Sequence, residues 1–316
     1  MSTSRSGFKL WEYKPSVGAA AVFTVIFLLF VAIIWAEVII ISKRAKKRMS
    51  HTLGRKLEHA DYHKSGFTRR KISLKYTCLI IGCVLETAGY IARIKSANSP
   101  EKMMPFIIQS VYILIAPSLT AASIYMVFGA MLILLECTSL SIVPAKHNTT
   151  FFVCGDVLSL LLQAGGGGLM IKQGSQTAGK CLAIAGLITQ LIFFGLFLIT
   201  EVRFLVLAPK KRIISPYLGN DWKVMNWALI ISSILILIRC VVRTIEFIEG
   251  QSGYIATHEW TLYVFDALLM TAAIGTIAGT LPFANLHHLN IAKMALTQIE
   301  ENGSDQMEES ISDQKV

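Results

Sequence analysis

Charged and hydrogen-bonding side chains recur at helical spacing inside the long apolar stretches of this 316-residue sequence. One stretch places Glu86, Tyr90 and Arg93 at i, i+4 and i+7, which is one face of an α-helix. Carboxylates and guanidinium groups on such a face are able to pair, to hold a charged headgroup or to exchange a proton. A charge at the centre of a bilayer costs about 2.5–3.5 kcal/mol on insertion scales. We therefore expect these side chains to face one another or a wet cavity.

Other apolar stretches carry the same kind of polar stripe. Two of them repeat the i, i+4, i+7 spacing, and a third uses i, i+3, i+7. In chain order the stripes are Asp156, Ser159 and Gln163, then Arg239, Arg243 and Glu246, and then Glu259, Tyr263 and Asp266. Gln109 and Tyr112 add two polar groups to another apolar stretch. Together with the first stripe, all of these residues except Ser159 are the candidates for substrate binding or gating.

The composition indicates an all-α, polytopic membrane protein with seven transmembrane helices. The mean hydropathy is +0.56, and only 16% of the residues are charged, which excludes an ordinary soluble enzyme. No other segment is long enough for a second domain, so residues 17–285 are expected to form one membrane domain. The expected spans are about 17–42, 73–94, 106–135, 152–171, 181–208, 223–247 and 259–284.

Alternate loops differ in Lys and Arg content, which predicts an orientation. One set carries 7 such residues and the other 17, of which 11 lie in residues 43–71. The positive-inside rule then places the N-terminus, residues 1–16, outside and the C-terminus inside. Most candidate residues fall in the outer half of the membrane, Gln163 near its midplane, and Asp156 near the cytosolic face.

The segments outside the spans have distinct compositions. The basic loop 43–72 is expected to contact anionic lipid headgroups, rather than nucleic acid, because it follows directly on a membrane helix. Residues 286–316 are polar and acidic and are expected to be a disordered cytosolic tail.

No motif in the sequence indicates an enzyme, a cofactor or a metal. Gly174–Cys181 is one residue short of a phosphate-binding loop, and Cys181 cannot supply the hydroxyl that such a loop gives to magnesium. His51, His59 and His63 lie in the basic loop, which offers no supporting shell for a metal site. No nucleophile–base arrangement lies in the spans.

Two features leave their alternatives open. The face of Arg239, Arg243 and Glu246 is either a salt-bridge lock between helices or a guanidinium site for an anionic or zwitterionic headgroup. The nearby acids are equally suited to a protonated amine. Four glycines, from Gly165 to Gly168, serve either close helix packing or a flexible joint.

The ordered set of motifs over about residues 8–285 resembles the fungal lipid-translocating exporter family, the RTA-like seven-helix proteins. The set comprises Tyr13-x-Pro15, Glu86-x-x-Gly89-Tyr90-x-x-Arg93, Gln109-Ser110, Ala116-Pro117, Ala122-Ser123-x-Tyr125-Met126, Asp156-Val157, Gln163 with its glycines, Gly186 with Gln190, Arg239-x-x-x-Arg243-x-x-Glu246 and Glu259-x-x-x-Tyr263-x-Phe265-Asp266. The chain has Gly129-Ala130 where the family often has Gly-Arg.

This resemblance implies a transporter or transport facilitator that moves amphiphilic molecules, such as sphingoid bases or aminosterols, across or between leaflets. Resistance to toxic amphiphiles would follow. The expected location is the plasma membrane, with an internal membrane as the alternative. A seven-helix lipid-sensing receptor that raises resistance indirectly by signalling is the other hypothesis. The oligomeric state does not follow from the sequence.

Overall fold

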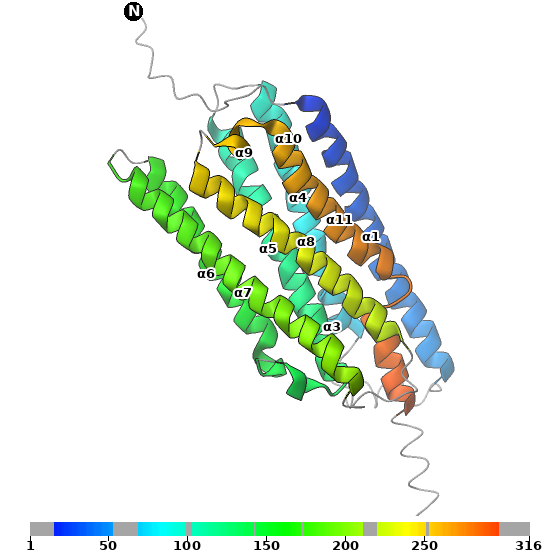
Figure 1. The fold of residues 1–316 in the computed structure, drawn as a ribbon. Coiled ribbons are helices and arrows are strands. Elements are labelled where there is room, and N and C mark those ends of the chain that lie inside the picture. The colour runs from blue at the N-terminus through cyan, green and yellow to red at the C-terminus, as the bar shows by residue number, and fades with distance from the viewer. Residues whose placement is uncertain are drawn as a thin grey trace, which may run out of the picture.

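The computed structural model describes residues 16–52, 69–98, 103–141, 143–171, 174–210, 220–250 and 253–296, and helices dominate it (Figure 1). Within these residues, seven helices are long and apolar enough to cross a membrane. The first six are α1 (Val17–Thr52), α4 (Thr77–Asn98), α5 (Met103–Leu134), α6 (Ala145–Ile171), α7 (Gln176–Lys210) and α8 (Asp221–Glu249). The prediction of an all-α membrane protein with seven spanning helices is confirmed.

The seventh spanning helix is composite. It begins with α10 (Glu259–Leu262), widens into the π-helical segment η3 (Tyr263–Leu268) and continues as α11 (Leu269–Thr280). Short helices flank the spans, namely α3 (Arg69–Leu74), η1 (Thr138–Leu140), α9 (Tyr254–Thr257) and a helix over residues 286–296.

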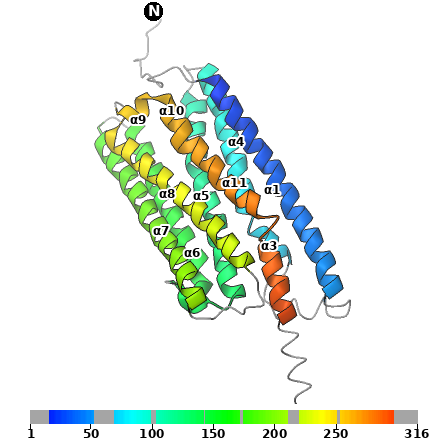
Figure 2. The same cartoon turned by 45° about the vertical axis from the view of Figure 1, so that its right-hand side comes forward.

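The seven helices form a closed bundle in which each one packs against the next in the chain (Figures 1 and 2). The ring closes where α1 packs against both α4 and α11. Helix α5 also contacts α8 across the bundle, and its side chains are largely buried. The apolar faces of the outer helices remain exposed, as side chains that meet lipid do. Residue 16 and the start of α10 lie at one end of the bundle, called here the N-terminal end.

The ends of two spans differ from the sequence-based expectation. Helix α1 continues to Thr52, so the expected loop 43–72 is helical at 43–52 and again in α3, while 53–68 lie outside the described residues. Lys and Arg favour helix, and cations at a helix C-terminus interact well with its dipole. At 36 residues, α1 is about 54 Å long and exceeds the hydrocarbon thickness.

The expected disorder of residues 286–316 is wrong for the described residues 286–296, which form a helix. Leu286, Leu289 and Met294 are buried, and Lys293 pairs with Glu136 at 2.9 Å. The acidic residues that suggested disorder begin at Glu300, beyond this helix and outside the described part. The buried apolar residues of this segment therefore decide that it is helical, in spite of the polar composition on which the expectation was based.

Glycines allow two pairs of helices to approach closely. On α6, a Cβ at Gly166 would lie 2.6 Å from the Ala183 nitrogen and the Gly179 oxygen of α7. A Cβ at Gly186 would lie 2.7 Å from the Ser159 oxygen of α6. Between α4 and α5, a Cβ at Gly89 would lie 2.9 Å from the Ile113 side chain. Close packing thus explains Gly166, whereas Gly167 and Gly168 have open space beside them.

We predict that Gly166→Ala destabilises the purified protein while Gly167→Ala does not. Both positions lie inside α6 and gain helix propensity from alanine, but only the first forces α6 away from α7. Overpacking of this kind costs about 1–3 kcal/mol. Thermal unfolding in detergent measures the difference. Equal melting temperatures for the two variants would contradict this packing.

Candidate functional site

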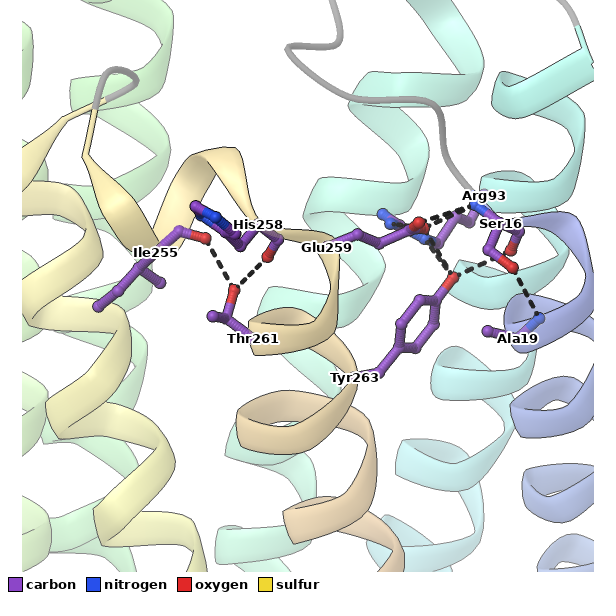
Figure 3. Close-up of polar contacts among 8 residues, drawn as sticks. All are labelled: Ser16, Ala19, Arg93, Ile255, His258, Glu259, Thr261 and Tyr263. Atoms are coloured by element: carbon purple, nitrogen blue, oxygen red, sulfur yellow. Dashed lines mark hydrogen bonds and ion pairs between the residues drawn. The ribbon is translucent and has the colours of Figure 1, made fainter.

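A hydrogen-bonded network joins three helices at the N-terminal end of the bundle (Figure 3). Arg93 of α4 donates to Glu259 Oε1 at 2.9 Å and to the Tyr263 hydroxyl at 3.1 Å. Glu259 also accepts from the backbone nitrogen of Ser16 at 2.7 and 3.0 Å, where α1 begins. The carboxylate thereby satisfies an end group of α1 and lies at the positive end of its dipole. Sequence spacing had put these residues on separate stripes; the fold makes them one unit.

The turn that leads into the seventh helix is fixed by its own hydrogen bonds. The Thr261 hydroxyl lies 2.7 Å from the Ile255 carbonyl and 2.5 Å from the His258 carbonyl (Figure 3). These bonds hold α9 against the start of α10, and so orient Glu259 toward Arg93.

A second ion pair lies deeper in the bundle. Arg239 of α8 pairs with Asp266 of η3, and their side chains are only 5% and 4% exposed. Arg239 also donates to the Ile113 carbonyl of α5 at 2.8 Å. The pair therefore links α8, the seventh helix and α5 in the interior of the bundle, where a lost partner is costly to replace.

Each arginine of the predicted layer has its own carboxylate, and one carboxylate is left over. Arg93 has Glu259, Arg239 has Asp266, and Arg243 has Glu246 at 2.8 Å. Glu86 is fully buried, and neither of its carboxyl oxygens has a hydrogen-bond partner among the described residues. It lies within electrostatic range of Arg239, Arg243 and Asp266. The charged candidates at this end of the bundle thus form three pairs and leave one surplus acid.

A cavity of about 30 Å³ lies between α8 and the start of the seventh helix, enough for one or two water molecules. Its lining includes Arg243, Glu246, Thr261 and Asp266. The Arg243 and Glu246 side chains are 18% and 24% exposed, so this pair lies at the rim while Asp266 lies inside. The cavity therefore connects the partly exposed Arg243–Glu246 pair with the buried Asp266.

The segment η3 shapes this layer. A π-helical turn inserts extra backbone into a helix, and such turns occur frequently at functional sites. Here the turn carries both Tyr263, which binds Arg93, and Asp266, which binds Arg239. One short segment of the seventh helix thus binds two arginines that come from different helices.

Three further candidate residues lie at this end of the bundle without taking part in the ion pairs. Tyr90 is fully buried and stacks on Phe27 of α1 at 5.6 Å between ring centroids. Its ring lies within electrostatic range of Glu86 and Asp266. Tyr112 is half-buried beside Gly89. Gln109 is buried, and its side-chain oxygen has no hydrogen-bond partner among the described residues.

Gln163 and Asp156 lie apart from the charged layer. Gln163 of α6 donates to Gln190 of α7 at 3.1 Å, and Gln190 donates to Ser118 of α5 at 3.3 Å. Helix α6 begins at Ala145 rather than at the expected residue 152, and the position of Asp156 near the cytosolic face stays a prediction. Asp156 therefore lies about three turns inside the helix, and it is 3% exposed.

The sequence analysis missed one buried acid. Glu201 of α7 is fully buried, and neither carboxyl oxygen has a hydrogen-bond partner among the described residues. It forms no polar stripe within its own helix, and Arg203 two residues later suggests a membrane surface. A single acid within the long apolar stretch 181–208 was the available signal.

Comparison with known proteins agrees with this architecture. The profile of the RTA1-like protein family matches residues 79–287. Protoporphyrin uptake protein 1 of Saccharomyces cerevisiae is 42% identical over 281 residues, which cover 87% of this chain and 92% of that protein. Protein RTA1 of the same yeast is 40% identical over 291 residues, or 91% of this chain and 89% of the relative.

A more distant relative is named for a different substrate. The sphingoid long-chain base transporter RSB1 of Saccharomyces cerevisiae is 30% identical over 239 residues, 61% of this chain and 60% of that protein. No solved structure matches the chain. The two named substrates, a porphyrin and a long-chain base, are both amphiphiles.

We predict that Arg239→Ala destabilises the protein far more than Arg243→Ala. The first change leaves Asp266 and Glu86 buried without their nearest cation, and breaking a buried pair costs about 3–5 kcal/mol. The second breaks a pair at the rim, where the loss is about 0–1 kcal/mol. Thermal unfolding in detergent separates the two, and a larger loss for Arg243→Ala would refute the assignment of depth.

Proposed function

Since this chain belongs to the RTA1-like family of seven-helix membrane proteins, we propose that it moves an amphiphilic, lipid-like molecule across or between the leaflets of a membrane. Resistance to toxic amphiphiles is the expected consequence. The observation that carries the proposal is Glu86, a fully buried acid left without a partner inside a layer of paired charges.

A protonated amine is the headgroup that fits Glu86 best. The three arginines already have carboxylate partners, so a bound cation meets the one acid that is not engaged. A charge-assisted hydrogen bond between an ammonium group and a carboxylate is about twice as strong as a neutral one. The named substrate of RSB1, a sphingoid long-chain base, has such an amine, and its alkyl chain suits the lipid-facing surfaces between helices.

An anionic amphiphile would bind an arginine of the same layer rather than Glu86. Arg243 lies at the rim of the cavity with its side chain 18% exposed, so its guanidinium group can meet a carboxylate or phosphate that displaces Glu246. Protoporphyrin, the molecule named for the most similar of the relatives described above, carries carboxylates on a flat apolar ring. One layer with both signs of charge therefore accommodates both kinds of headgroup, and amphiphilicity is the shared requirement.

The cavity beside α8 supplies the route to this layer. The Arg243–Glu246 pair is the partly exposed part of its lining, so a headgroup would enter there while its tail stays in the membrane. At about 30 Å³ the cavity is far smaller than a ligand site of about 300–1,000 Å³. The described conformation is thus closed, and transport requires the cavity to widen.

We predict that Glu86→Gln lowers the flux of a fluorescent sphingoid base in proteoliposomes by about tenfold or more, the loss expected for one hydrogen bond to a charged group. The substitution keeps the volume of the side chain and removes only its charge. Because no hydrogen bond within the described residues holds the Glu86 carboxyl group, the melting temperature should stay the same or rise. If Glu86 instead held the helices together through a salt bridge, Glu86→Gln would lower the melting temperature.

The matched control is Glu136→Gln. Glu136 lies outside the spans, and its side chain is 75% exposed. Flux of the base in wild type and in this control, with loss in Glu86→Gln, supports direct transport through the charged layer. Binding of the base without flux above that of empty vesicles would contradict the transporter proposal and favour the lipid-sensing receptor.

A further inference from the structure

A second buried polar group without a hydrogen-bond partner lies beside Glu86. Tyr90 of α4 is fully buried, and its hydroxyl forms no hydrogen bond with any described residue. Glu86 comes four residues earlier in the same helix, so both side chains project from one face, with about 5–6 Å between their Cβ atoms. The function proposed above uses the acid and leaves the phenol without a role.

Aromatic packing fixes the position of this phenol. The Tyr90 ring stacks on Phe27 of α1 at 5.6 Å and lies 5.9 Å from the ring of Phe23, measured between centroids. Phe23 in turn stacks on Tyr263 of the seventh helix at 5.6 Å. A ring held by two neighbouring rings keeps one orientation, so its hydroxyl is preorganised for the group that approaches it.

The two tyrosines that flank Phe23 differ in how their hydroxyls are used. The Tyr263 hydroxyl forms hydrogen bonds with Arg93 at 3.1 Å and with Glu259 at 3.2 Å, whereas the Tyr90 hydroxyl has no such partner in the described part of the chain. A phenyl ring would be enough for packing, and a buried hydroxyl that stays unpaired is unfavourable. The Tyr90 oxygen therefore indicates a polar group that comes from outside the protein, either a headgroup or a water molecule.

We propose that Glu86 and Tyr90 together bind a headgroup whose ammonium and hydroxyl groups lie on neighbouring carbon atoms, that is, the headgroup of a long-chain amino alcohol. This inference rests on the function proposed above. The ammonium group binds the Glu86 carboxylate and the hydroxyl group pairs with that of Tyr90, each over about 2.7–3.0 Å. Two such bonds, with the two carbon atoms between them, bridge side chains that are one helical turn apart.

The two residues contribute different parts of the selectivity. The charge of Glu86 favours amines over neutral lipids, whereas the phenol distinguishes one amine from another. A site built to hydrogen-bond a hydroxyl group rejects the analogue that lacks it, because the polar group of the site is then left unpaired. A simple alkylamine therefore satisfies Glu86 but leaves the Tyr90 hydroxyl without a partner.

The ratio of two fluxes in proteoliposomes measures this preference. One probe is a long-chain 2-amino-1-alkanol and the other is the alkylamine of equal chain length, each with the same fluorophore at the end of its tail. After subtraction of the rate in empty vesicles, wild type below saturation should move the amino alcohol about three- to tenfold faster, the factor expected for one additional neutral hydrogen bond. The ratio does not depend on the amount of folded protein, because both fluxes come from the same preparation.

Tyr90→Phe keeps the packed ring and removes only the hydroxyl. Its flux ratio should fall to about one through a loss of amino alcohol flux, while the alkylamine flux stays unchanged. The matched control is Tyr125→Phe, because Tyr125 is also fully buried and its hydroxyl also lacks a partner among the described residues. Tyr125 packs on Phe152 of α6 and Phe197 of α7, so this control should keep the wild-type ratio. Both variants should melt at or above the wild-type temperature, since each loses an unpaired buried hydroxyl.

A wild-type ratio near one, or a preference that survives in Tyr90→Phe, would overturn this inference and leave the proposed function intact; the Tyr90 hydroxyl would then meet water only. If wild type moves neither probe faster than empty vesicles do, the proposed function fails, and binding decides the inference. The amino alcohol should then raise the melting temperature of the purified protein more than the alkylamine does, and Tyr90→Phe should abolish the difference. Equal increases in wild type would overturn the inference as well.

Discussion

A buried charge in a membrane needs either an opposite charge or a proton, and this requirement organises the whole bundle. At the N-terminal end, Arg93 and Arg239 meet it through Glu259 and Asp266, both from the seventh helix. These two pairs also connect α1, α4, α5 and α8, because Glu259 binds the start of α1 and Arg239 binds a carbonyl of α5. The positions of five helices thus follow from where two acids lie on one short segment.

Two groups of buried acids satisfy this requirement in different ways. The charged layer at the N-terminal end contains arginine–carboxylate pairs and the acid Glu86, which has no hydrogen-bond partner among the described residues. Asp156 and Glu201 are also buried, and none of the ion pairs between described residues reaches them. The first group is therefore balanced mainly by arginines, whereas the second has no arginine partner in the described part of the chain.

The number of helices and the presence of a polar interior could be predicted from the sequence, since apolar length and helical spacing are local properties. The pairing within that interior could not, because it depends on how each helix is rotated against its neighbours. Arg93 shares a stripe with Glu86 but binds Glu259 of a distant helix. Glu201 was missed for the same reason, as its neighbours Tyr125 and Ser233 come from other helices. The helix over 286–296 depends on tertiary contacts that tail composition does not reveal.

The glycine contacts divide the bundle into parts that differ in rigidity. Backbone touches backbone where α6 meets α7 at Gly166 and Gly186, and α4 and α5 approach closely at Gly89. Separation within either pair would open voids that nothing fills. A movement that opened the bundle would therefore carry α4–α5 and α6–α7 as two packed pairs. The charged layer joins α4 of the first pair to α1, α8 and the seventh helix, so it lies across the boundary at which the pairs can move.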